Sequence, residues 1–197
     1  MHRNPFHPVF IAAALSACAA QPELLNSDRI KERFGSYGIN VLAADGNVRR
    51  SSLYSTDNGE RTSRTYAVVR FVGSNVTDIS ATHQKVVAGS SIGSTFRTDG
   101  WDIVKRTVYV GEIAMQDLAH PVAQRMRLDE PGNLALHAYQ LHIEKNSLSM
   151  HYATIIEIHH PDYLSQDELL EIYPLPDGEP LSDDDVAALV ALVLSGD

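Results

Sequence analysis

The densest group of titratable side chains in the sequence lies between residues 157 and 163 and includes Glu157, His159 and His160. In a regular strand, Glu157 and His159 share one face about 6.6 Å apart. A carboxylate at that separation can orient an imidazole, or both groups can bind one metal ion. The three residues are therefore the catalytic candidates for a metal-assisted or general acid/base hydrolase. The competing interpretation is a solvated Glu157 on a strand and a turn at His160-Pro161 before the next helix.

A second histidine pair is expected on neighbouring strands. His142 and His151 lie opposite each other, or diagonally, across a predicted hairpin, and the Cβ atoms of directly opposite residues are about 5 Å apart. The pair could bind a divalent ion, but the sequence offers no third ligand, and stable zinc sites use three or four. The competing interpretation is two solvent-facing polar side chains. His83 and His137 fall on predicted apolar faces, where we expect hydrogen-bonded core residues.

Sequence motifs of nucleophilic catalysis and of nucleotide binding are absent. The chain has no Gly-x-Ser-x-Gly segment. Its Gly/Ser-rich loop at residues 89–95 lacks the lysine of a P-loop and does not match Gly-x-Gly-x-x-Gly. We therefore expect no cofactor. The sequence favours a binding or scaffolding protein over an enzyme, with the hydrolase as the alternative.

The N-terminal segment has the pattern of an export signal. Arg3 precedes residues 9–17, an uninterrupted run of apolar or small residues that ends at Cys18, the single cysteine of the chain. A membrane-spanning helix needs about 20 apolar residues, so this run is too short to span a bilayer and is typical of a cleaved signal. The segment Leu15-Ser16-Ala17-Cys18 resembles the lipobox of bacterial lipoproteins.

The resemblance implies how the chain is processed and where it is located. Residues 1–17 would be removed as a lipoprotein signal peptide, and fatty acyl chains such as palmitate would be attached to Cys18. Attachment by more than one acyl chain anchors a protein stably to a membrane. Ala19, in place of an Asp, implies transport to the periplasmic side of the outer membrane in a Gram-negative host. The alternatives are a conventional cleaved signal and a cytosolic protein with a buried cysteine.

The composition is that of one acidic domain. The chain has 197 residues, with 16 Lys+Arg and 25 Asp+Glu and a net charge of -9. Loss of residues 1–17 removes only Arg3 from this count, which leaves 15 basic and 25 acidic residues and a net charge of -10. Nucleic-acid binding and attachment through a polybasic patch both need clustered Lys and Arg, and are excluded. The expected partners are the membrane, through Cys18, and another envelope protein or a cell-wall component.

Turn signals and alternating polarity predict a single α+β domain at residues 27–197, joined to the lipidated N-terminus by a tether at residues 18–26. We expect a mostly antiparallel sheet of about six strands with helices packed on one face. The expected strands are 39–42, 48–55, 65–72, 101–110, 134–144 and 148–159, with hairpin turns at Asp45-Gly46 and Asn58-Gly59.

Capping signals predict the helices. The first is expected from a cap at Ser27 to Gly35, and two more at 78–88 and 92–99. Capping motifs at 165–168 and 182–185 predict two C-terminal helices. Residues 113–131 are ambiguous, with a helix around 115–119 as one interpretation.

The faces of the last hairpin follow from counting residues back from its turn. A two-residue turn places His137 and Tyr139 beside Ile156 on an apolar face. The other, more polar face then carries the titratable candidates Glu157, His159, His142 and His151.

Overall fold

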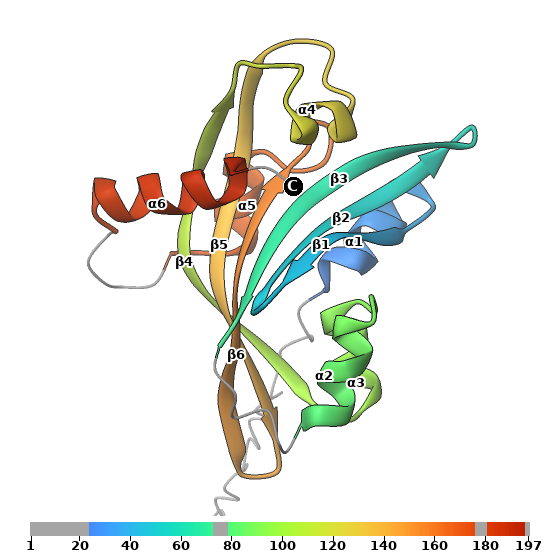
Figure 1. Ribbon diagram of the computed structural model, residues 1–197, viewed down its shortest axis with the longest axis vertical. Helices are drawn as coiled ribbons and strands as arrows, with labels where there is room; N and C mark the ends of the chain where they lie inside the picture. Colours follow the sequence, from blue (N-terminus) through green and yellow to red (C-terminus); the bar gives the residue numbers. More distant parts are fainter. Residues whose placement is uncertain (1–23, 73–78, 176–180, 196–197) are drawn as a thin grey trace, which may run out of the picture.

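The computed structural model describes residues 24–72, 79–175 and 181–195. Six strands form one antiparallel sheet in the order β1-β2-β3-β6-β5-β4 (Figure 1). The strands are β1 (Gly38–Asp45), β2 (Val48–Asp57), β3 (Glu60–Phe71), β4 (Asp102–Met115), β5 (Gly132–Lys145) and β6 (Leu148–His159). The helices of these ranges are α1 (Asn26–Phe34), α2 (Ser80–Val87), α3 (Ile92–Thr98), α4 (Pro121–Met126), α5 (Gln166–Ile172) and α6 (Asp183–Leu194). The predicted α+β class with an antiparallel six-stranded sheet is confirmed.

Tight turns join three pairs of strands that are consecutive in sequence. The β2–β3 turn has positive φ at Asn58 (49°) and Gly59 (83°), as a type I′ hairpin requires. Gly46, between β1 and β2, has a φ of 55°, and Asn146, in the two-residue turn between β5 and β6, has a φ of 54°. The turn predicted at Asn58-Gly59 is confirmed, whereas the turn predicted at Asp45-Gly46 lies one residue later, at Gly46-Asn47, because Asp45 still pairs with Val48.

A β-bulge in β6 changes which side chains share a face of the sheet. Near the turn, His142 lies opposite His151, but the next pair along β5 is Leu141 opposite Ala153, so Tyr152 is an extra residue in β6. One extra residue reverses the face of every position beyond it. The predicted faces of the hairpin are therefore correct near the turn and wrong beyond the bulge.

The bulge also corrects the predicted environment of two catalytic candidates. Glu157 is paired with His137, and His159 with Ala135. Both side chains share a face with Tyr139 and lie away from the histidine pair near the turn. Glu157 is 5% exposed and His159 1% exposed. The alternative of a solvated Glu157 is therefore wrong.

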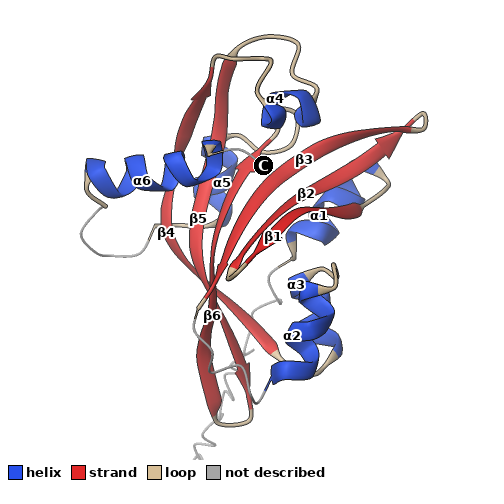
Figure 2. Ribbon diagram, in the orientation of Figure 1, coloured by secondary structure: helices blue, strands red, loops and turns tan. Residues whose placement is uncertain are grey.

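Helices cover both faces of the sheet, whereas one covered face was predicted (Figure 2). Helices α4 and α6 pack on the face that carries Tyr66, Leu136 and Ile156. Helices α1 and α5 pack on the other face, here called the pocket face, against Leu53 and Ala67. Helices α2 and α3 cover the pocket face near the β5–β6 turn. Because the central strands are apolar on both faces, each face needs a covering layer.

The C-terminal helices begin where their capping motifs predict. At α5, Ser165 Oγ accepts a hydrogen bond from the Glu168 N–H at 3.2 Å, and Glu168 Oε2 accepts one from the Ser165 N–H at 2.7 Å. This reciprocal pair is the capping box. Ser182 caps α6, where its Oγ accepts a hydrogen bond from the Asp185 N–H at 3.2 Å.

The ambiguous segment 113–131 contains the end of a strand and a short helix. Strand β4 runs to Met115, so the helix considered around 115–119 is wrong. Helix α4 instead begins at Pro121, because proline suits the first helical position, where no N–H is needed. The ring of His120 completes this start by accepting a hydrogen bond from the Val122 N–H at 3.2 Å.

Helix α1 begins earlier than predicted. Its first residue is Asn26, and Ser27 is not its cap. Leu25 and Asn26 are both buried, so the folded part of the chain includes the end of the predicted tether. The helix ends as predicted at Gly35, whose φ of 72° is left-handed. Within the described ranges, no helix is long and apolar enough to cross a membrane.

Candidate functional site

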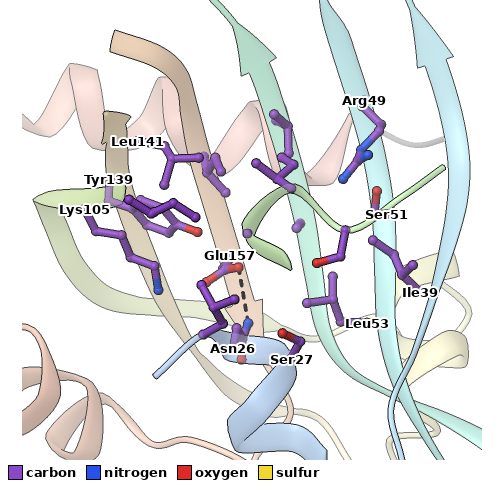
Figure 3. Close-up of a pocket in the computed structure, with 18 of the residues that line it drawn as sticks. Asn26, Ser27, Ile39, Arg49, Ser51, Leu53, Lys105, Tyr139, Leu141 and Glu157 are labelled. Atoms are coloured by element: carbon purple, nitrogen blue, oxygen red, sulfur yellow. Dashed lines mark hydrogen bonds between the residues drawn. The ribbon is translucent and has the colours of Figure 1, made fainter. Parts of the chain in front are cut away.

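A pocket lies between the pocket face of the sheet and the N-terminal ends of α1 and α3 (Figure 3). The cavity has a volume of about 70 Å³ inside a recess of about 570 Å³ that opens to solvent, and every strand contributes to its mostly apolar lining. A mostly apolar lining with a few charged or polar side chains is typical of small-molecule sites. Three charged side chains line this cavity, here called the sheet pocket: Arg49, Lys105 and Glu157.

Arg49 extends into the sheet pocket from β2 (Figure 3). It is 2% exposed, and its Nη1 donates hydrogen bonds to the carbonyl oxygens of Val86 at 2.8 Å and Ser90 at 3.1 Å. Its Nε has no hydrogen-bond partner, and neither has Oγ of Ser51, two residues further along β2. Burial lowers the pKa of Arg49, but a guanidinium stays protonated in proteins. This side of the pocket therefore presents a buried cation and two unpartnered polar atoms.

Glu157 and Lys105 line the pocket from β6 and β4, across from Arg49 (Figure 3). Glu157 Oε1 accepts a hydrogen bond from Asn26 Nδ2 at 3.2 Å. Lys105 Nζ donates to the Tyr173 hydroxyl at 3.0 Å and lies over the Tyr139 ring, 5.1 Å from its centroid. The polar groups on this side are held by partners from the protein itself.

A buried hydrogen-bond network fixes the position of Asn26 behind Glu157. Asn26 Nδ2 also donates to Thr65 Oγ1 at 3.2 Å, and Asn26 Oδ1 accepts a short hydrogen bond from the Tyr163 hydroxyl. Thr65 Oγ1 lies 3.0 Å from His159 Nδ1. The network joins α1, β3, β6 and the segment before α5, and so holds α1 over the pocket.

His159 lies in this network as a neutral side chain. Thr65 Oγ1 accepts from Asn26, so its own proton can be donated to His159 Nδ1, which places the imidazole proton on Nε2. Burial, with a smaller contribution from the charge of Lys105, lowers the pKa of His159 to about 3. His159 Nε2 lies 4.0 Å from Glu157 Oε2 and has no hydrogen-bond partner. The two groups therefore form neither an ion pair nor a hydrogen bond.

His160 lies outside the pocket, in the turn that leads to α5. Its backbone N–H donates to the Arg64 carbonyl oxygen at 3.0 Å, and its Nδ1 accepts a hydrogen bond from the Asp162 N–H at 3.0 Å. This is the turn role that the competing interpretation assigned to it. Of the three catalytic candidates, Glu157 lines the pocket, His159 is buried behind it and His160 forms a turn.

Three further histidines singled out from the sequence, His142, His151 and His83, do not line the sheet pocket. His142 and His151 are directly opposite each other, with stacked rings whose centroids are 5.1 Å apart. No group of three or more His, Cys, Asp or Glu side chains that could hold a metal ion occurs among the described residues. His83 Nδ1 lies 2.9 Å from the Tyr152 hydroxyl, as expected of a hydrogen-bonded histidine. Cys18 lies outside the described ranges.

Sequence reasoning missed most of the pocket residues. Arg49 and Lys105 each lie inside a predicted strand, which gives a weak signal because a charged residue there needs a partner or a solvent-facing position. Asn26 has no signal at all in the sequence. Arg49 and Lys105 meet only through the pairing of strands that are far apart in the chain, and Asn26 joins them through the packing of α1 on the sheet.

Comparisons with known proteins leave the function to be argued from the site. No protein-family model matches the chain, and no curated protein matches it. Among solved structures, the crystal structure of the PhnF C-terminal domain is similar over 71% of this chain and 77% of that chain, with a TM-score of 0.40 and 15% sequence identity. A likeness at this level supports no conclusion about function.

Proposed function

We propose that the protein is a lipid-anchored envelope lipoprotein whose domain binds a small organic molecule in the sheet pocket. The observation that supports this most is the pair of buried, unpartnered atoms, Arg49 Nε and Ser51 Oγ, in the lining of an apolar cavity. A buried polar group without a partner costs about 1–3 kcal/mol. A ligand that supplies the missing partner explains why such groups are kept together in one cavity.

The location rests on the N-terminal sequence. The lipobox-like segment ends at Cys18, and the lipid on this residue holds the domain at the periplasmic side of the outer membrane. The folded domain therefore binds its ligand in the cell envelope. Another envelope protein or a cell-wall component is then the partner to which a binding module would pass or present its ligand.

The hydrolase alternative has less support from the site. General acid/base catalysis needs titratable groups within hydrogen-bond reach of the reacting atoms and a pKa near the working pH. His159 is buried behind Glu157, and its pKa is about 3. His160 lies in a turn outside the pocket. Glu157 is thus the one member of the predicted group that a bound molecule could contact.

Binding to the pocket can be tested with an uncharged probe. Residues 19–197 contain every described helix and strand, and this chain, labelled with ¹⁵N, would be titrated with 3-phenylpropan-1-ol in two-dimensional NMR. We expect saturable shifts confined to residues that line the sheet pocket. Shifts that do not saturate, or that cluster elsewhere, would contradict the proposal.

Matched variants show whether the cavity itself is the binding site. Ala67 lines the pocket, and Ala138 is equally buried on the opposite face of the sheet. Ala67→Leu fills the cavity and should abolish the shifts, whereas Ala138→Leu should leave binding by its folded fraction unchanged. Binding that survives in Ala67→Leu places the probe in another site.

The anchor is tested separately in cells. Growth with an alkyne analogue of palmitate should label the full chain but not the Cys18→Ala variant, and the labelled protein should be recovered with the outer membrane. Label on the variant, or recovery of the wild type in the soluble fraction, would contradict lipidation at Cys18.

A further inference from the structure

We infer that the ligand of the sheet pocket carries an acidic group, a carboxylate or a similar monoanion, which pairs with Arg49 while an apolar body fills the rest of the cavity. This inference rests on the proposed function, because it specifies the ligand of the same pocket. It is drawn from the charge, the hydrogen bonds and the lining of the pocket.

Arg49 is a buried cation without an acidic partner among the described residues. Its protein partners are two backbone carbonyl oxygens, of Val86 and Ser90, both bonded to Nη1. The other buried arginine, Arg64, is satisfied differently: it lies over the Phe34 ring at 3.9 Å and has Asp162 Oδ2 at 3.8 Å. A buried charge is costly unless it is paired. Arg49 is the position in the pocket where an anion from outside would complete the pairing.

The guanidinium of Arg49 is oriented for a carboxylate. Its bonds to Val86 and Ser90 occupy Nη1 and fix the plane of the group. The edge formed by Nε and Nη2 is left for the ligand, and this edge matches the two oxygens of a carboxylate. Ser51 Oγ, 1% exposed and without a partner, lies on the same face of β2 and can donate a further hydrogen bond.

The charge balance of the lining also favours an anion. The pocket is lined by two formal positive charges, Arg49 and Lys105, and one negative charge, Glu157. The lining therefore has an excess of one positive charge, in a chain whose net charge is -9. Lys105 and Glu157 lie together on the far side, so the uncompensated charge is that of Arg49 (Figure 3).

The remaining lining determines the body of the ligand. Side chains such as Leu53, Val69, Leu141 and Ile155 form the wall between the two polar sides. An apolar ligand body is favoured there because this wall removes its surface from water. A molecule with one acidic end and an apolar remainder therefore satisfies both parts of the pocket.

Three probes of the same shape and different charge test this inference. Residues 19–197 would be titrated at pH 7.5 with 3-phenylpropanoate, 3-phenylpropan-1-ol and 3-phenylpropylamine, and the dissociation constants measured from NMR shifts. We expect the acid to bind about tenfold to a hundredfold more tightly than the alcohol, as hydrogen bonds to a charged group imply. The amine should bind more weakly than the alcohol.

A variant pair assigns the preference to one residue. Arg49→Gln should remove the advantage of the acid over the alcohol, whereas Arg70→Gln, an exposed arginine on β3, should preserve it. Arg49 also holds the end of α2, so its replacement could unfold the domain. In that case the comparison of the three probes on the wild-type chain still decides the inference.

The outcomes separate this inference from the proposed function. If none of the three probes binds, the pocket is not a ligand site and both fail. If the alcohol binds as tightly as the acid, the pocket is still a ligand site, but the inference that its ligand carries an acidic group is wrong. If the amine binds most tightly, Glu157 and not Arg49 selects the ligand, and the inference is overturned.

Discussion

The side chain of Asn26 should contribute more to the free energy of unfolding than the side chain of any other described Asn or Gln, because it joins α1 to the sheet. Its Nδ2 donates to Glu157 and Thr65, both at 3.2 Å, and its Oδ1 accepts from the Tyr163 hydroxyl. Asn26→Ala removes all three hydrogen bonds and leaves each partner in the interior. The first residue of α1 then has no polar contact with β3 or β6.

The expected loss follows from the number of bonds. A buried hydrogen bond contributes about 1 kcal/mol net, so three bonds give a loss of about 3 kcal/mol in the free energy of unfolding. For a domain of this size, about 1 kcal/mol corresponds to about 2–4 °C in Tm, which gives a decrease of about 6–12 °C. The loss should be accompanied by weaker probe binding, because Asn26 lines the sheet pocket.

The chain offers a matched control for this substitution. Asn133 Nδ2 also donates to a glutamate, Glu112 Oε2 at 2.9 Å, but at the surface. Urea unfolding of residues 19–197 should show that Asn133→Ala costs less than about 0.5 kcal/mol, the usual limit for surface positions. If Asn26→Ala costs no more than Asn133→Ala, the network does not hold α1 in place and the reasoning is wrong.

Three further predictions concern stability. Burial lowers the pKa of His137 to about 2 and that of His159 to about 3, from 6.5 when unfolded, so the unfolded chain binds more protons below pH 6.5. The free energy of unfolding should therefore be constant above about pH 6.5. As the pH falls from about 6 to 4, it should decrease by about 3 kcal/mol per pH unit. Equal urea midpoints at pH 7.5 and pH 5 would contradict this. In the same assay, Ala67→Leu should cost less than about 1 kcal/mol because the pocket accepts the added atoms. Ala138→Leu should cost about 1–3 kcal/mol because it overpacks the core. Similar losses for the two variants would mean that the cavity is not open. Ser165→Ala removes the cap of α5 and should cost about 1 kcal/mol by thermal unfolding, and an unchanged Tm would show that the capping box contributes nothing.

The fold could be predicted from the sequence where a signal is local. Asn58-Gly59 specifies its turn because both residues accept positive φ, and Ser165 with Glu168 specifies the start of α5 by reciprocal hydrogen bonds. Pro121 shows the limit of such signals. Proline ends a helix that precedes it but also begins one that follows it, and the sequence alone did not distinguish the two.

The environment of Glu157 could not be predicted, for a physical reason. The faces of a strand are assigned by counting, and the bulge at Tyr152 inserts one residue into that count. Tyr152 and Ala153 are both compatible with a buried position, so no change of polarity marks the insertion. The count placed Glu157 on the more polar face with His142 and His151, whereas it lies in the pocket on the opposite face.

The pocket itself depends on contacts between distant parts of the chain. Arg49 and Glu157 are separated by more than one hundred residues and are brought to one cavity by the order of the strands. The sequence of β2 shows an arginine within a strand but not what that arginine faces. Which residues line such a site can be identified only when the order of the strands in the sheet is known.

If Cys18 carries the proposed lipid, the position of Leu25 keeps the pocket near the membrane. Leu25 lines the sheet pocket and lies seven residues after Cys18, and a fully extended chain of that length spans at most about 25 Å. With acyl chains on Cys18, the cavity stays within that distance of the lipid headgroups. An acidic amphiphile dissolved in the bilayer would then meet the protein by lateral diffusion in two dimensions. Occupancy of the pocket would follow the composition of the membrane more closely than the concentration of the ligand in the surrounding water.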